Sequence, residues 1–171
     1  MENIELNLTS RKEQTQALNF FIESIKNNKK HILIQAPTGV GKSYMIMMMI
    51  DYFLNNIDSS AKFDILTNTK LLQTQYTKDF SFLNSLKGKE NYYCRQHKCS
   101  CDEGSEVNKY FGDDSIESLF PSCKNCPYKM DLSNFLTKTV SLTNFHLYCS
   151  FIMYVPTLLE ERKARILFID E

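Results

Sequence analysis

The 171-residue sequence predicts an α/β fold built on a mainly parallel sheet. Short apolar runs alternate with longer segments of helical periodicity, which is the pattern of strand–helix–strand units. A glycine-containing turn joins one early apolar run to a helix, as such units require. Apolar residues make up 43% of the chain and charged residues 23%, a balance typical of a packed core.

The elements are predicted in chain order. Ser10 and Glu13 have the spacing of a capping box, which opens a helix with an apolar face of Leu18, Phe21, Ile22 and Ile25. The run HILIQ at 31–35 predicts a buried strand, and a helix follows from 42 to about 55. Further strands are predicted at 63–67, 139–143 and 165–169, and further helices at 71–80 and from 145 to about 153.

The cysteines are unevenly distributed. Five of the six fall in a window with little apolar periodicity: Cys94, Cys99, Cys101, Cys123 and Cys126. We therefore expect residues 1–85 and 131–171 to form the α/β domain and residues 86–130 to form an insert. Cys149 stands apart on an apolar helical stretch, which is typical of a buried core cysteine.

Composition excludes several classes of protein. Lysine plus arginine and aspartate plus glutamate number 20 each, which excludes a strongly basic binder but not a local nucleic-acid groove. No apolar run approaches the ~18–20 residues of a membrane span, and the acidic N-terminus does not resemble a signal peptide. We therefore expect a cytoplasmic protein, or a nuclear one in a eukaryote, with reduced cysteines and no membrane partner.

The glycine-containing turn has the pattern of a phosphate-binding loop. Backbone N–H groups of such a loop point at the β-phosphate, and the following helix adds a partial positive charge. Lys42 is expected to bind the β- and γ-phosphates, and the Ser43 hydroxyl to bind Mg²⁺. The first position of the G-x-x-x-x-G-K-[ST] pattern is alanine here. The candidate loop residues are Ala36, Pro37, Thr38, Gly39, Val40, Gly41, Lys42 and Ser43.

Two acidic residues follow the last predicted strand. Asp170 and Glu171 are expected at the carboxyl end of the strand, which is the edge of a parallel sheet where nucleotides bind. Asp170 is expected to hold Mg²⁺ through water, and Glu171 to act as the general base for the attacking water. The loop and this pair together predict an ATP-binding enzyme.

The cysteine window predicts a metal centre. Cys123 and Cys126 have the C-x-x-C spacing, which lets two sulfur atoms on one tight turn reach one metal. Four thiolates fit either a tetrahedral Zn²⁺ ion or an iron–sulfur cluster, and the spacing leaves both open. His97, between Cys94 and Cys99, also keeps a mixed zinc site open.

Together these motifs resemble the DinG/XPD type of superfamily-two DNA helicase. Arg11 and Gln14 resemble its adenine-reading Q motif, and the phosphate loop resembles its motif I. Other similar segments are 67–75 (motif Ia, which contacts the DNA backbone), 86–94 and 123–128 (entry and exit of its iron–sulfur domain), 140–145 (its V-x-x-T-N step) and 170–171 (the start of its D-E-A-H box).

The resemblance implies a RecA-like P-loop domain that binds single-stranded or forked DNA and carries a small iron–sulfur insert. It implies a [4Fe–4S] cluster held by Cys94, Cys101, Cys123 and Cys126, with Cys99 as an alternative ligand. The implied DNA contacts are Thr69, Lys70, Gln73, Thr143 and Asn144. Three tyrosines near the cysteines are expected either to stack on bases or to shield the cluster: Tyr92, Tyr93 and Tyr128.

The family also has a second motor domain with arginine fingers, which this sequence lacks. We therefore expect this chain alone to bind nucleotide and metal but to hydrolyse ATP poorly, with the second motor domain supplied from elsewhere. Two alternatives stay open. One is a P-loop ATPase switch with a zinc insert, and the other is a non-catalytic nucleic-acid-binding remnant of a helicase.

Overall fold

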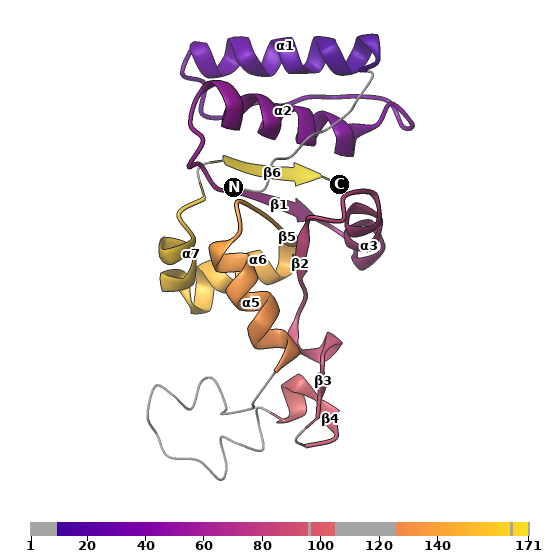
Figure 1. The fold of residues 1–171 in the computed structure, drawn as a ribbon, viewed down its shortest axis with the longest axis vertical. Coiled ribbons are helices and arrows are strands. Elements are labelled where there is room, and N and C mark those ends of the chain that lie inside the picture. Colours follow the sequence, from indigo (N-terminus) through magenta and orange to yellow (C-terminus); the bar gives the residue numbers. More distant parts are fainter. Residues whose placement is uncertain (1–9, 96, 105–125, 165, 171) are drawn as a thin grey trace. The chain divides into compact units, whose positions relative to one another are not determined.

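The structure is a computed structural model that describes residues 10–95, 97–104, 126–164 and 166–170. It divides into two compact units, of which the first ends at Ala61 and the second runs from Lys62 to Ile169. Figure 1 shows two helices in the first unit and a sheet with its helices in the second. Among the described residues, no helix is long and apolar enough to cross a membrane.

The first unit is a pair of packed helices, α1 (Lys12–Lys26) and α2 (Lys42–Asn56). Helix α2 agrees with the prediction and buries most of its apolar side chains: Met45, Ile46, Met47, Met49, Ile50 and Phe53. The predicted start of α1 is wrong by one residue, because Arg11 is the N-cap and its N–H donates to Gln14 Oε1 at 2.9 Å. The buried face of α1 also differs from the predicted one: it consists of Gln14, Ala17, Phe21 and Ser24, of which Gln14 and Ser24 are polar.

The predicted strand at 31–35 is not present. Residues 31–37 have no regular secondary structure, and Leu33 is 90% exposed. Alternating apolar residues are compatible with a strand, but a strand exists only where a neighbouring strand pairs with its N–H and C=O groups. In the structure, this segment forms no such ladder.

The second unit contains a four-stranded sheet in the order β2-β5-β1-β6. Its strands are β1 (Phe63–Thr67), β2 (Asn84–Leu86), β5 (Val140–Asn144) and β6 (Ile166–Asp170). Strand β5 pairs in parallel with both β1 and β2, which confirms the mainly parallel sheet. Strand β1 is buried along its whole length, as a central strand of an α/β sheet should be.

Four helices accompany this sheet: α3 (Lys70–Asp79), α5 (Pro127–Thr137), α6 (Phe145–Tyr154) and α7 (Pro156–Arg162). Helices α3 and α6 agree with the prediction, whereas α5 and α7 were not predicted. Helix α5 packs against β2 and α7. The rings of Phe135 and Phe151 bring α5 and α6 together at a centroid distance of 6.0 Å.

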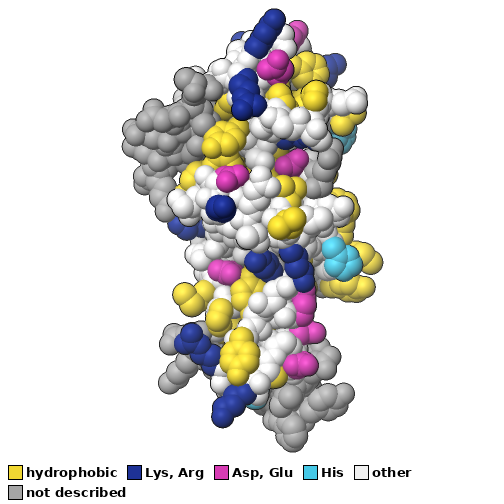
Figure 2. Space-filling view, turned by 90° about the vertical axis from the view of Figure 1, so that its right-hand side faces the viewer, with side chains coloured by type: hydrophobic (Ala, Val, Ile, Leu, Met, Phe, Trp, Pro, Cys, Tyr) yellow, Lys and Arg dark blue, Asp and Glu magenta, His cyan; other side chains and the backbone are white. Residues whose placement is uncertain are grey.

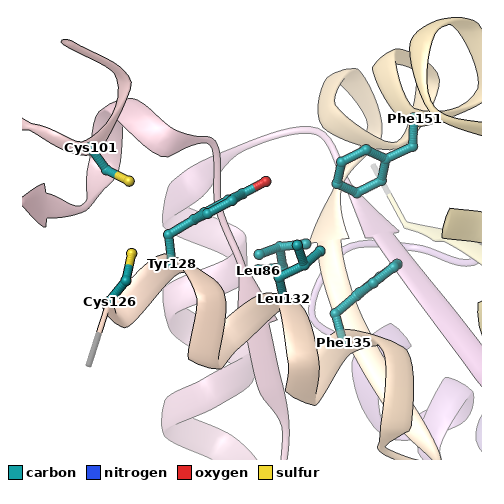
Figure 3. Close-up of a cluster of buried hydrophobic side chains, with 7 residues drawn as sticks. All are labelled: Leu86, Cys101, Cys126, Tyr128, Leu132, Phe135 and Phe151. Atoms are coloured by element: carbon teal, nitrogen blue, oxygen red, sulfur yellow. The ribbon is translucent and has the colours of Figure 1, made fainter. Parts of the chain in front are cut away.

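The cysteine segment begins directly after β2. It contains a short 3₁₀ turn (Lys89–Asn91), an antiparallel hairpin of β3 (Tyr93–Cys94) and β4 (Cys99–Ser100), and a helical turn at 101–104. One buried cluster joins this segment to the helices of the second unit (Figure 3). Its members are Leu86, Cys101, Cys126, Tyr128, Leu132, Phe135 and Phe151.

A buried ion pair ties α7 to the amino ends of β1 and β5. Arg162 Nε lies 2.9 Å from Asp64 Oδ1, and both side chains are fully buried. The guanidinium also donates to three backbone carbonyl oxygens, those of Lys138 at 2.6 Å, Phe63 at 2.9 Å and Thr139 at 3.2 Å. Arg162 therefore joins three elements that are distant in the sequence.

Candidate functional site

The phosphate loop has the backbone conformation that its glycines predict. Gly39 and Gly41 have φ angles of +79° and +84°, in the left-handed region where residues with a Cβ are strained. Gly41 is the N-cap of α2, and its carbonyl oxygen accepts the first helical bond, from Met45 N at 3.1 Å. Lys42 and Ser43 form the first turn of α2, where the partial positive charge of the helix favours an anion.

The side chains of Gln14, in α1, and of Arg11, the N-cap of α1, bind the carbonyl oxygens of this loop. Gln14 Nε2 donates to Val40 O at 2.9 Å, and Arg11 Nη1 donates to Gly39 O at 3.0 Å. The sequence predicted Arg11 and Gln14 as adenine contacts and missed their contact with the loop. No local pattern could have revealed it, because Gln14 and Val40 are 26 positions apart.

The two acidic residues after the last strand are only partly described. Asp170 is the final residue of β6 and is half-buried. The predicted general base, Glu171, lies outside the described residues.

The carboxyl ends of β1 and β5 carry two of the predicted DNA contacts. These strands pair in register, with Thr67 opposite Asn144, and each leads into a helix. Thr69 Oγ1 accepts a hydrogen bond from Leu72 N at 3.2 Å, and Asn144 Oδ1 accepts one from Leu147 N at 2.7 Å. Two helix N-termini, α3 and α6, therefore start from one edge of the sheet.

A third predicted DNA contact, Lys70, lies in the first turn of α3. Its Nζ is 3.5 Å from Glu90 Oε1, and both side chains are 58% exposed. An ion pair this exposed is weak, so it leaves the ammonium group accessible to a phosphate.

The two remaining predicted DNA contacts have buried side chains. Gln73 and Thr143 are fully buried, and both side chains donate to Leu86 O, at 3.3 and 2.9 Å. They hold α3 and β5 to the end of β2. The sequence shows that Gln73 and Thr143 are polar. It does not show that α3 and β5 pack against the end of β2, which buries both side chains around Leu86 O.

Cys101 and Cys126 point toward one another (Figure 3). Burial and the neighbouring, hydrogen-bonded Cys126 thiol raise the pKa of Cys101 to about 11. Cys94 is also buried, and a Cβ added at Gly104 would lie 3.2 Å from its Sγ. Cys99 is half-buried.

Cys123 lies outside the described residues. Within the described ranges, no group of three or more His, Cys, Asp or Glu side chains is arranged to hold a metal ion.

The three tyrosines near the cysteines have different environments. The Tyr92 hydroxyl donates to Asp131 Oδ2 at 2.9 Å and accepts from Lys87 N at 3.1 Å. Tyr128 is buried, and its ring meets that of Tyr92 edge-on at a centroid distance of 5.4 Å. Tyr93, by contrast, is 60% exposed. Tyr92 and Tyr128 therefore pack around the cysteines, and Tyr93 is accessible for stacking.

The molecular surface carries charges of both signs. On the face shown in Figure 2, lysine and arginine side chains are interspersed with aspartate and glutamate. This agrees with the balanced composition, so nucleic-acid binding would depend on particular side chains more than on a broad basic surface.

Comparison with protein families identifies the class of this chain. Residues 7–169 match the family model described as type III restriction enzyme, res subunit. The comparisons with curated proteins and with solved structures gave no match. The family has a helicase-type motor domain of superfamily 2, which implies binding of ATP, Mg²⁺ and nucleic acid. The chain, with its α/β fold and phosphate loop, belongs to the family of the type III restriction enzyme res subunit.

Proposed function

We propose that the chain is the N-terminal motor part of an ATP-dependent DNA helicase of the DinG/XPD type. The observation that carries this proposal is the phosphate loop, in which two left-handed glycines lead into α2, and the side chains of Arg11 and Gln14 hold the loop carbonyls. A second motor domain belongs to the same proposal.

The nucleotide chemistry is assigned to the loop and to the acidic pair. Lys42 binds the β- and γ-phosphates, while Ser43 and Asp170 hold Mg²⁺. Glu171 is the proposed general base. The remaining loop residues, except Pro37, which has no backbone N–H, bind phosphate oxygens through their backbone N–H groups.

The test of the nucleotide site is the affinity of the 171-residue chain for Mg-ATP, measured by calorimetry. We expect Lys42→Ala to weaken binding about tenfold to a hundredfold, because a charge-assisted bond to phosphate is lost. Lys30→Ala is the matched control, since Lys30 is exposed and outside the loop. Equal affinities for the wild type and Lys42→Ala would refute the assignment.

The cysteine segment is proposed to hold an iron–sulfur cluster. Thiolates are the donors that such a cluster requires, and Cys94, Cys101 and Cys126 are three buried thiols that could supply them. Cys123 is the proposed fourth ligand, and Cys99 is the alternative to Cys101. When bound, the cluster would stabilise the segment that helps to separate duplex DNA.

Anaerobic purification tests this part of the proposal. We expect brown protein that contains iron and acid-labile sulfide, and loss of both in Cys126→Ser. Cys149→Ser is the control, because Cys149 lies on α6 and outside the cysteine segment. Protein that contains neither iron nor sulfide would contradict the cluster.

One observation favours a second candidate, a P-loop ATPase switch with a zinc site. His97 Nε2 is buried and has no hydrogen-bond partner. The His97 ring lies beside Cys94, since both approach within 3.3 Å of a Cβ added at Gly104. A histidine nitrogen together with thiolates is a common zinc donor set. Colourless protein with one zinc ion per chain, and an ATPase that single-stranded DNA does not stimulate, would support this candidate.

The DNA-binding part of the proposal now rests on Thr69, Lys70, Asn144 and Tyr93. The first three lie where β1 and β5 lead into their helices, and they suit contacts with phosphates. Tyr93 suits stacking on an unpaired base. ATPase activity on single-stranded DNA, measured after a second motor domain is supplied, separates a motor from a non-catalytic nucleic-acid-binding remnant.

A further inference from the structure

We propose that Gln14 is a positioning residue that sets the phosphate loop, and that it does not read the nucleotide base. The inference rests on the proposed nucleotide site and assigns a role to one residue of it. It departs from the adenine-reading role that the resemblance implies for Gln14.

The polar atoms of the Gln14 side chain are already engaged. Its Nε2 donates to Val40 O at 2.9 Å, and its Oε1 accepts from Arg11 N at 2.9 Å. The side chain is only 7% exposed. Reading adenine with a glutamine amide uses the amide N–H as a donor and the carbonyl oxygen as an acceptor at the same time. Gln14 uses one N–H and one lone pair of these groups within the protein, and the burial of its side chain restricts access to the second N–H and the second lone pair.

The bond from Gln14 also determines where the loop directs its N–H groups. A trans peptide unit is planar, and its C=O and N–H point in opposite directions. With Val40 O held toward α1 by Gln14, the N–H of Gly41 points away from α1. Arg11 holds Gly39 O in the same way, at 3.0 Å, so the N–H of Val40 also points away.

Successive N–H groups directed to one side form a concave site for an anion. The positive φ angles of Gly39 and Gly41 permit this orientation on both sides of Val40. Packing is close here, because a Cβ at Gly41 would lie 2.7 Å from Gln14 Nε2. Through these N–H groups, the Gln14 amide therefore affects the binding of the triphosphate, which every nucleoside triphosphate shares.

The variant Gln14→Glu separates this role from helix capping. Glutamate retains an oxygen that can accept from Arg11 N, as in an ordinary capping box, but it cannot donate to Val40 O. Gln14→Met provides an uncharged version that also lacks the donor. Gln16→Met is the matched control, since Gln16 is exposed on the same helix.

The experiment measures dissociation constants of the 171-residue chain for Mg-ATP, Mg-GTP and Mg-tripolyphosphate, with the thermal midpoint of each variant as the folding control. We expect Gln14→Glu and Gln14→Met to weaken all three ligands by a similar factor, about tenfold, because a buried carbonyl loses its donor and the loop loses its set conformation. The ratio of ATP to GTP affinity should stay at the wild-type value.

A base-reading Gln14 would give a different result. ATP binding would weaken, tripolyphosphate binding would not change, and the preference for ATP over GTP would be lost, which would overturn the inference. Unchanged affinity for all three ligands in a folded Gln14→Met variant would overturn it as well. A wild-type chain that binds none of the three would instead refute the proposed nucleotide site, and the inference with it.

Discussion

Replacement of Arg162 by methionine should strongly destabilise the second unit. Methionine is close to arginine in length and is apolar, so the substitution removes the charge and the donors with little loss of packing. The variant leaves the buried Asp64 carboxylate without its cation. It also removes the donor that serves three backbone carbonyl oxygens at the amino ends of β1 and β5.

The magnitude follows from this environment. Removing one partner of a buried ion pair costs about 3–5 kcal/mol, since the remaining charge is left uncompensated. A domain is stable by about 5–15 kcal/mol, so the loss is a large fraction of the total. For a chain of this length it corresponds to a fall of roughly 6–20 °C in Tm, at about 2–4 °C per kcal/mol.

Urea unfolding followed by far-UV circular dichroism measures the free energy of unfolding of each variant. Lys163→Met is the matched control, because Lys163 is the exposed neighbouring cation, and its loss should change stability by less than about 0.5 kcal/mol. Asp64→Asn and the double variant complete a mutant cycle. We expect the double variant to be more stable than the sum of the single losses indicates, by about 0.5–3 kcal/mol, because a neutral amide replaces the stranded carboxylate.

The reasoning would be refuted if Arg162→Met cost less than about 1 kcal/mol, the value of an exposed pair. Additive effects in the cycle would also refute it, since they would show that Arg162 and Asp64 do not interact.

Three further predictions concern other parts of the chain. Burial raises the pKa of Asp64 above its ordinary value of 3.8, so the folded state binds a proton more readily than the unfolded state. In urea titrations, the stability of the wild type relative to Asp64→Asn should therefore rise as the pH falls toward 3.8. The opposite trend would show that Asp64 is better stabilised as a carboxylate. Lys70→Ala should reduce the slope of log binding constant against log salt concentration for single-stranded DNA by about 0.7, as measured by fluorescence anisotropy, whereas Lys78→Ala, at the other end of α3, should leave this slope unchanged. Equal slopes for both variants would show that Lys70 does not contact the DNA. Gly41→Ala should cost about 1–3 kcal/mol in urea unfolding and weaken Mg-ATP binding, because φ is +84° and the new Cβ would lie 2.7 Å from Gln14 Nε2; retention of both properties would show that the loop tolerates another conformation.

Features that depend on neighbours along the chain were predicted well. The phosphate loop is recognisable because two glycines, a lysine and a serine stand at fixed spacing before a helix, and the left-handed φ angles of Gly39 and Gly41 follow from that pattern. Strand β1 and helices α2, α3 and α6 lie within a residue or two of their expected bounds. Helix α5 could have been found as well, since Tyr128, Leu132 and Phe135 have helical spacing, but the preceding cysteines favoured an insert that extended to residue 130.

Features that depend on remote partners were not predicted. The alternating apolar residues of HILIQ at 31–35 are compatible with a strand. A strand forms only where its backbone pairs with a neighbouring strand, and the local pattern does not specify that neighbour. The apolar run FDILT was recognised as a strand, but nothing in it identified the buried partner of Asp64, Arg162, which is 98 positions away. Gln73 and Thr143 looked like surface contacts until their side chains were found to converge on Leu86 O.

The amino-acid order was thus sufficient for the α/β class and for the conformation of the glycine turn before α2, because helix periodicity and glycine conformation are properties of a few consecutive residues. The three-dimensional fold alone decided which polar side chains are buried and which groups they bind. Gln14 shows why: its type fits an adenine contact, whereas its bond to Val40 O arises only because the fold places α1 beside the loop, where both residues are buried.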